Sequence, residues 1–233
     1  MVTDGVCATV YSGLENGTVL ASQIQGDEVK HSTIQFHQSF PVSSISVDKY
    51  SSSLSVAYPD GSVIQQCSEN QQTKFYPRYG CKRLYSITQS EQMILSTINC
   101  TQYSNTEPVL SIQCCRPSVY FTSLALNPYS QNELVLGCSD GAVESYDLRN
   151  PSSSVTSYQE HKGQVTEVVV SLTGILSISM DGTAVRRKAG GDCERLVIDR
   201  CPLWECSVDD KSQLMATGGQ SGRLFLVPLS YVC

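Results

Sequence analysis

Two-residue turn signals recur along this chain at intervals close to 40 residues. They separate β-like runs and are 44, 80, 41 and 40 residues apart. The turn pairs are Asn16-Gly17, Asp60-Gly61, Asp140-Gly141, Asp181-Gly182 and Ser221-Gly222. Asn-Gly and Asp-Gly pairs tolerate positive φ and fit the strand twist of a tight hairpin. The interval of 80 residues is twice the others, so it predicts another turn near residue 100, in MILSTINCTQYSN. The chain is therefore expected to repeat a hairpin-based unit about six times.

Short apolar and β-branched runs fill the sequence between these turns, and no window sustains a helical period. Around Asp181 the expected strands are 154–159, 165–171, 174–179 and 183–187. The next unit repeats them at 194–199, 203–208, 213–218 and 223–228. The sequence therefore predicts an all-β chain with four strands per unit.

The period, the phrase Leu134 to Arg149 and the loop His161-Lys162-Gly163 together resemble the WD-repeat β-propellers. The family pattern is Gly-His, an inner strand, a second strand, an Asp turn and a strand ending in Trp-Asp. The resemblance covers nearly the whole chain. It implies an all-β propeller of about six four-stranded blades, forming a single domain over residues 1–233.

The resemblance assigns structural roles to a small set of residues. His161 takes the loop His position and Tyr146-Asp147 the Trp-Asp position, while the turn Asp positions hold Asp60, Asp140 and Asp181. His161 is expected to reach Asp181 through Ser177 or Ser179, unless it is an ordinary loop residue. No unit carries Trp-Asp itself, and the equivalent positions hold Ser22, Gln66, Arg187 and Val227. At Arg187 the resemblance predicts weaker order between blades.

The strand count suggests a ring that is incomplete at its N-terminus. Counting along the sequence gives 22 strands, whereas six closed four-stranded blades need 24. A segment of about 15 to 25 residues before Met1 would supply the innermost strand of the first blade and the outermost strand of the last. The parent would then have six blades, or seven if a whole repeat is missing. The alternative is an open propeller that a partner's strand closes.

Composition limits the ligand classes and the compartment. A net charge of -6 and a pI near 5.0 argue against nucleic acid as the principal ligand. The basic stretch is interpreted as a solvated strand face; it contains Arg186, Arg187, Lys188, Arg195 and Arg200. No run approaches the roughly 20 apolar residues that span a bilayer, so no membrane insertion is expected. Eleven cysteines at irregular spacing favour reduced thiols in the cytoplasm or nucleus.

The sequence offers no motif for catalysis, a cofactor or a metal. Only His31, His37 and His161 could serve as histidine bases, and none lies in a recognisable signature. Phosphate-cradling and dinucleotide motifs are absent from the sequence. The eight- and five-residue spacings of Cys193, Cys201 and Cys206 do not fit common zinc sites. We therefore expect a chain that is not an enzyme, with no catalytic, cofactor-binding or metal-binding residues.

Two functions from different classes of binding protein follow from the resemblance. The first is a non-enzymatic scaffold for protein–protein interactions, whose partners are other subunits of a complex. The second is a substrate receptor of a cullin-RING ubiquitin ligase, whose members carry a sixteen-residue box ending in Trp-Asp, an aliphatic residue and Arg or Lys. Leu134 to Arg149 resembles that box, with departures at Leu136, Cys138, Ser145 and Tyr146.

In the receptor hypothesis Asp147 and Arg149 are the protein-binding residues, and Arg149 docks on the ligase adaptor. The simpler interpretation is that both residues only finish a strand. A third possibility, an enzyme on a propeller, has no motif to support it. Which complex, which partner and which face of the propeller are involved stay open at the level of the sequence.

Overall fold

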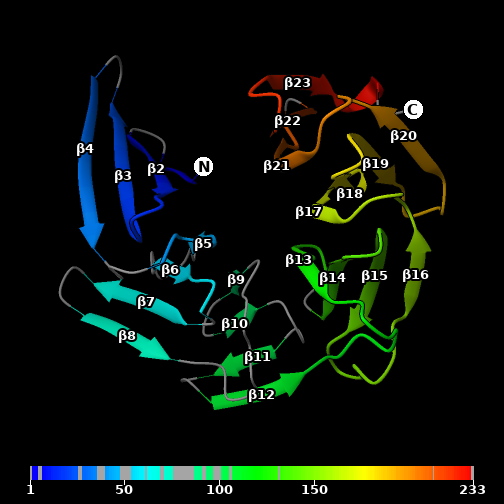
Figure 1. Cartoon of the computed structure of the whole chain (residues 1–233), viewed down its shortest axis with the longest axis horizontal. Helices are drawn as coiled ribbons and strands as arrows, with labels where there is room; N and C mark the ends of the chain where they lie inside the picture. Colours follow the sequence, from blue (N-terminus) through cyan, green and yellow to red (C-terminus); the bar gives the residue numbers. More distant parts are fainter. Residues whose placement is uncertain are drawn as a thin grey trace. The chain divides into compact units, whose positions relative to one another are not determined.

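The computed structural model is built of antiparallel β-strands (Figure 1). It describes residues 2–4, 7–25, 28–35, 40–47, 54–60, 62–68, 71–75, 87–90, 93–96, 101–104, 107–130, 132–211 and 213–231. Within these residues there are 23 strands and one short 3-10 helix, η1 (Leu229–Tyr231). The chain divides into two compact units, Met1–Ser111 and Ile112–Cys233.

Three four-stranded antiparallel sheets make up the described part of the first unit. Their strand orders are β1-β2-β3-β4, β5-β6-β7-β8 and β12-β11-β10-β9. The first sheet comprises β1 (Val2–Asp4), β2 (Cys7–Gly13), β3 (Thr18–Gln25) and β4 (Glu28–Gln35). The second comprises β5 (Ser44–Val47), β6 (Leu54–Ala57), β7 (Val63–Ser68) and β8 (Gln71–Phe75). The third comprises β9 (Ile87–Ser90), β10 (Met93–Ser96), β11 (Thr101–Ser104) and β12 (Glu107–Ser111).

The second unit has two four-stranded sheets and, among its described residues, one sheet of three strands. The first contains β13 (Phe121–Leu126), β14 (Glu133–Cys138), β15 (Ala142–Asp147) and β16 (Thr156–Gln159). The next contains β17 (Val165–Ser171), β18 (Gly174–Ser179), β19 (Thr183–Arg187) and β20 (Cys193–Val197). The last contains β21 (Leu203–Asp209), β22 (Leu214–Gly219) and β23 (Leu224–Pro228). Every neighbouring pair is antiparallel and consecutive in sequence.

The sheets of the second unit repeat one another in detail. The first strand of each has a register irregularity near its start, at 121–123 in β13, 165–167 in β17 and 203–205 in β21. Such a bulge bends the strand and re-aims the side chains beside it. In β13 the hydroxyl of Thr122 donates to the carbonyl oxygens of Gly137 and Val165, at 3.2 and 2.5 Å. The bulge thereby joins the first sheet of this unit to the next.

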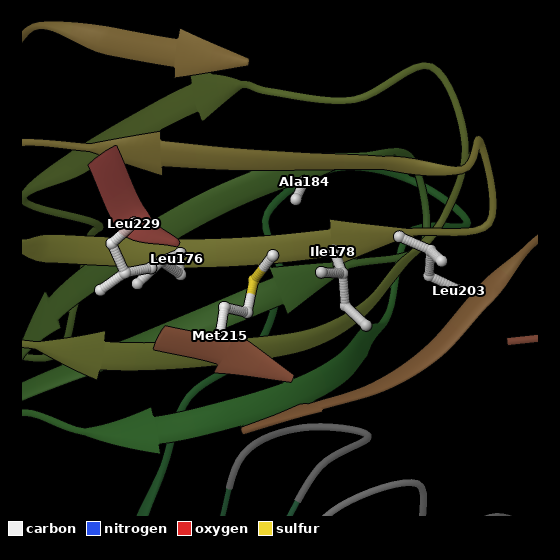
Figure 2. Packing of buried hydrophobic residues seen from close by; sticks show 6 residues of the cluster. All are labelled: Leu176, Ile178, Ala184, Leu203, Met215 and Leu229. Carbon is white, nitrogen blue, oxygen red and sulfur yellow. The ribbon is translucent and has the colours of Figure 1, made fainter. Parts of the chain in front are cut away.

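The hydrophobic core of the second unit lies between its sheets. One cluster joins the last two sheets, and all six of its members are fully buried: Leu176, Ile178, Ala184, Leu203, Met215 and Leu229. Figure 2 shows the Met215 side chain between Leu176 and Ile178. A second cluster, formed by Val135, Val143, Val165 and Val168, joins the first two sheets. Burial of such a side chain contributes about 1.5–3 kcal/mol, so this packing holds successive sheets together.

The all-β prediction is confirmed, and the strands expected at 165–171, 174–179 and 183–187 have the observed bounds. The four-strand units expected from the sequence are out of phase with the sheets. The strand expected at 154–159 opens the unit around Asp181, but the observed β16 pairs with β15 and not with β17.

The expected count of 22 strands is wrong: the described residues form 23, since Val2–Asp4 pairs with β2 as a further strand at one edge of the first sheet. A run of three residues is too short to show the alternation that reveals a strand. No helix of the described residues is long and apolar enough to cross a membrane.

Candidate protein-interaction site

Three of the turns predicted from the repeat share one pattern of hydrogen bonds. Asp181 Oδ1 accepts from the N–H and the hydroxyl of Thr183, at 3.0 and 2.6 Å. Asp60 receives the same two bonds from Ser62, at 2.9 and 2.6 Å. Asn16 receives them from Thr18, at 3.1 and 2.7 Å. The turn expected near residue 100 lies outside the described residues.

His161 is buried at the centre of a polar network in the sheet β17–β20. Its Nδ1 is 2.8 Å from Thr183 Oγ1 and 3.5 Å from Asp181 Oδ1, and its Nε2 is 2.8 Å from Ser177 Oγ. The single hydroxyl hydrogen of Thr183 goes to Asp181, so Thr183 Oγ1 accepts from His161 Nδ1, and Ser177 donates to Nε2. Asp181 Oδ2 also accepts from the Lys162 N–H at 2.8 Å. The network fixes the loop before β17 to strands β18 and β19.

Burial sets the protonation state of this histidine. It lowers the pKa of His161 below its ordinary value, although the charge of Asp181 acts in the opposite direction. Burial alone would raise the pKa of Asp181, but hydrogen bonds from Thr183 and Lys162 lower it. The pair therefore consists of a neutral ring beside an ionised carboxylate. Of the two serines proposed from sequence, Ser177 contacts the ring, whereas Ser179 Oγ accepts the Asp181 N–H at 3.1 Å.

The resemblance predicted weaker order between blades at Arg187, where the structure shows contacts between two sheets. The Arg187 guanidinium lies over the Tyr158 ring, 3.7 Å from the ring centroid, and its Nε pairs with Glu160. Tyr158 is on β16 and Glu160 follows that strand, whereas Arg187 is on β19. An ion pair and a cation–π contact thus join the two sheets where the family has tryptophan.

Tyr146 belongs to a second, charge-based network in the sheet β13–β16. Its hydroxyl donates to Glu144 Oε2 at 2.8 Å, and its ring forms a T-shaped pair with that of Phe121 at a centroid distance of 6.2 Å. Arg116 Nη1 lies 2.7 Å from Glu144 Oε1, and its Nε lies 2.9 Å from Asp140 Oδ2. Asp140 in turn accepts the Ala142 N–H at 3.2 Å. Arg116 therefore connects the loop before β13 to the hairpin turn, as His161 does in the next sheet.

Asp147 and Arg149 form a local ion pair where β15 ends. Asp147 Oδ1 accepts the Arg149 backbone N–H at 2.9 Å, and Asp147 Oδ2 lies 2.6 Å from Arg149 Nη2. Hydrogen bonds from Arg149 lower the pKa of Asp147 to about 2. The Arg149 side chain is 71% exposed. This geometry finishes the strand and also holds an arginine in one orientation at the surface.

Asp210 ties three hairpin turns of the second unit together. Its Oδ2 accepts from the Tyr129 hydroxyl at 2.9 Å, and its Oδ1 accepts from the Leu172 N–H at 3.1 Å. Tyr129 lies in the β13–β14 turn, Leu172 in the β17–β18 turn and Asp210 in the β21–β22 turn. Tyr129 is 55% exposed and Leu172 is 66% exposed. We call these three residues and their turns the hairpin surface.

Four of the five residues in the basic stretch have partners within the fold, two in their own sheet and two in the preceding sheet. Arg186 and Lys188 both pair with Glu194, and Arg195 donates to the carbonyl oxygen of Glu160. Together with the Arg187–Glu160 pair, these contacts direct most of the positive charge toward partners inside the fold. The expectation of a solvated strand face is wrong for Arg186, which is 6% exposed, whereas Arg195 and Arg200 are exposed.

A small cavity lies between β15–β16 and β18–β19. Its volume is about 10 Å³, room for one water molecule. Polar lining comes from Ser145, Thr156, Tyr158, Glu160, Ser177 and Arg187. In the part of the chain that the structure describes, no three His, Cys, Asp or Glu side chains gather as metal ligands would.

Several residues that organise these sites were not found from the sequence. Glu144 and Glu160 supply buried charges, the half-buried Arg116 pairs with Glu144, and Asp210 joins the turns. The available signal was a charge inside an apolar β run, as at Glu144 in AVESYD. Such a charge needs a buried partner, but the repeat pattern does not say which residue supplies it.

Comparisons with known proteins define the fold and nothing narrower. No family model matches the chain, and no curated protein matches it. Among solved structures it is similar to a chain in the crystal structure of the mitotic checkpoint complex, with 14% identity and a TM-score of 0.78. The match covers 94% of this chain and 73% of that chain. The chain therefore has an all-β propeller fold built of antiparallel sheets of three and four strands.

Proposed function

We propose that this chain is a non-enzymatic scaffold that mediates protein–protein interactions within a multi-subunit complex. Its partners are other protein subunits, and its binding surfaces are turns that rigid sheets hold in place. The cysteine pattern favours the cytoplasm or the nucleus as its compartment.

The hairpin surface is the observation that carries this proposal. One carboxylate accepts the hydroxyl of the exposed Tyr129 and the backbone N–H of the exposed Leu172. These bonds reduce the entropy lost when a partner orders the Tyr129 side chain and the Leu172 backbone. Tyrosine is enriched among the residues that dominate binding energy at protein interfaces. The similar structure is described as a complex, which agrees with a role among protein partners.

Affinity purification of the native protein, followed by mass spectrometry, tests the proposal. We expect partners at fixed stoichiometry, and we expect a Tyr129→Ser/Leu172→Ser variant to lose at least one of them. Val197→Ser is the matched control, because Val197 is also exposed, at 69%, but lies on β20 away from these turns. Recovery of the protein alone, with no stoichiometric partner, would contradict the scaffold function.

The exposed Arg149 supports a second candidate function, the substrate receptor of a cullin-RING ubiquitin ligase. Asp147 fixes the Arg149 guanidinium at the surface, as docking on the ligase adaptor would require. Co-purification of the adaptor should be lost on Arg149→Ala and kept on Arg200→Ala, since Arg200 is exposed as well. Purification without any adaptor would exclude this candidate.

A further inference from the structure

The hairpin surface contains a tyrosine–carboxylate pair that has no cation beside it in the described part of the chain. Asp210 Oδ2 accepts from the Tyr129 hydroxyl at 2.9 Å, and Asp210 Oδ1 accepts from the Leu172 N–H at 3.1 Å. The bond to Asp210 raises the pKa of the Tyr129 hydroxyl, so at neutral pH the hydroxyl keeps its proton and donates. Both donors are neutral, and no ion pair of the described residues includes Asp210 or the adjacent Lys211. The charge of Asp210 is therefore not compensated within this surface.

The same arrangement occurs around Glu144 in the sheet β13–β16, where an arginine completes it. Glu144 Oε2 accepts from the Tyr146 hydroxyl at 2.8 Å, and Glu144 Oε1 accepts from the Ser157 hydroxyl at 3.2 Å. Arg116 Nη1 lies 2.7 Å from that second oxygen. Each carboxylate oxygen has two acceptor sites. A carboxylate that already holds a tyrosine hydroxyl and one further neutral donor can therefore still take a guanidinium.

A second arginine shows what the tyrosine ring contributes. The Arg187 guanidinium lies 3.7 Å from the centroid of the Tyr158 ring, while its Nε pairs with Glu160. One guanidinium thus stacks on a ring and pairs with a carboxylate at the same time. Tyr129 is 55% exposed, and no aromatic pair or cation–π contact within the described ranges involves its ring. Its ring can therefore take the same contact from outside.

The turns of the hairpin surface are closed by hydrogen bonds of their own. The Asn127 N–H donates to the Glu133 carbonyl at 2.9 Å, and the Gln213 side chain donates to the Asp210 carbonyl at 2.6 Å. A sheet grows at its strand edges and not at its turns. Further strands would therefore leave this surface exposed, and the fold itself does not require anything to cover it.

The second unit does not supply the missing cation from its own described arginines. Those whose side chains form no hydrogen bond or ion pair among the described residues are Arg200 and Arg223. Arg223 directly precedes β23, and Asp199, next to Arg200, accepts from the Ser221 hydroxyl. Both arginines thus lie at the β22–β23 turn, whereas Asp210 lies at the other end of β22. The cation that would match Asp210 has to come from elsewhere.

We propose that the hairpin surface binds an arginine side chain of a partner protein, with the guanidinium paired to Asp210 and stacked on the Tyr129 ring. Arginine fits better than lysine, because its planar group can pair with a carboxylate and lie on a ring at once. The net charge of -6 also attracts a basic segment. This inference rests on the proposed scaffold function and names the chemistry by which one partner is recognised.

Selection from a random peptide library tests this site, with the full chain and its Asp210→Asn variant as targets. Asparagine keeps the shape of the side chain and removes its charge. Peptides that the parent chain retains and the variant does not should share an arginine. Asp192→Asn is the matched control, because Asp192 is an exposed acid on the β19–β20 turn, and it should retain the same peptides as the parent. Unchanged amide NMR signals of Leu176 and Met215 in both variants would show that the core between the sheets is kept.

A double-mutant cycle then places the peptide arginine on Asp210. Citrulline in its place keeps the size and removes the charge, and should weaken binding to the parent chain roughly tenfold, as measured by fluorescence anisotropy. Asp210→Asn should weaken the arginine peptide by a similar factor and leave the affinity of the citrulline peptide nearly unchanged. Tyr129→Leu should weaken the arginine peptide by about threefold. Lysine in place of arginine should also bind more weakly.

Three results would overturn the arginine site: no peptide whose binding depends on Asp210, Asp210-dependent peptides that lack arginine, or citrulline and Asp210→Asn losses that multiply independently. The first result would also follow if another segment of this chain already occupied the surface. Peptide binding needs no cellular partner. Its failure alongside a stoichiometric complex would remove the arginine site and leave the scaffold function, whereas peptide binding without any complex would contradict the scaffold function alone.

Discussion

Arg187 lies over the ring of Tyr158 at 3.7 Å and joins two sheets at the position where the WD repeat has tryptophan. Glu160, which is 3% exposed, completes the contact as the ionic partner of Arg187. A buried carboxylate without its cation is strongly destabilising. The junction therefore depends on both members of the pair.

Arg187→Ala should lower the free energy of unfolding by about 3 kcal/mol, because it leaves Glu160 buried and unpaired. Chemical denaturation at pH 7.5 measures the change. Arg200→Ala, at an exposed position, should change it by less than about 0.5 kcal/mol. The double variant Arg187→Met/Glu160→Leu should be more stable than Arg187→Ala, since no charge is left without a partner. Equal losses in these two variants would show that packing, and not the ion pair, holds the junction.

The His161 network should make stability depend on pH. Burial lowers the folded-state pKa of His161 below its ordinary value of 6.5, so the unfolded chain takes up the proton first. The contribution of His161 is therefore complete above pH 6.5 and is lost as the pH falls below it, by at most about 1.4 kcal/mol per pH unit. Denaturation curves at pH 7.5, 6.5 and 5.5 measure this slope.

His161→Gln is the control for that slope. The variant should be less stable at pH 7.5, and the drop in its stability between pH 6.5 and 5.5 should be smaller than in the parent protein. The pKa of Asp181 is lowered from 3.8, so its contribution to stability is lost only below about pH 3.8. It does not affect the slope between pH 7.5 and 5.5. An unchanged slope in the variant would assign the pH dependence to other groups.

The repeat pattern predicted the strands well because two-residue turns and alternation are local properties. Gly174–Ser179 and Thr183–Arg187 were expected with the bounds that the structure has. The partners of buried charges were not predictable, since Arg116 and Glu144 lie 28 residues apart and meet only after the sheet forms. The roles expected of Asp147 and Arg149 in binding stay predictions, because the observed ion pair serves a strand end and a docking site equally well.

The turn at Gly182 provides a test of the repeat geometry. Gly182 has a φ of 79°, and a Cβ there would clash with the carbonyl oxygen of Asp199. Gly182→Ala should therefore lower the free energy of unfolding by about 2 kcal/mol or more. Gly190→Ala is the matched control, because a Cβ at Gly190 would have no neighbour within 4 Å, and it should be close to neutral. Similar thermal midpoints for the two variants would contradict the strained turn.

Glu167 on β17 should oppose stability at neutral pH. Burial raises its pKa well above the ordinary 4.5, and the charge of Glu205 raises it further. A carboxyl group with a raised folded-state pKa favours folding while it is protonated, and this contribution is lost as the pH rises through that value. Glu167→Gln keeps the shape and removes the charge, so at pH 7.5 it should increase the free energy of unfolding measured by chemical denaturation. The gain should shrink toward pH 4.5, and Glu15→Gln, at an exposed position, should show neither effect. A loss of stability at pH 7.5 would instead mean that the folded chain stabilises the Glu167 carboxylate. The charges of Glu167 on β17 and Glu205 on β21 would then not repel each other in the folded chain.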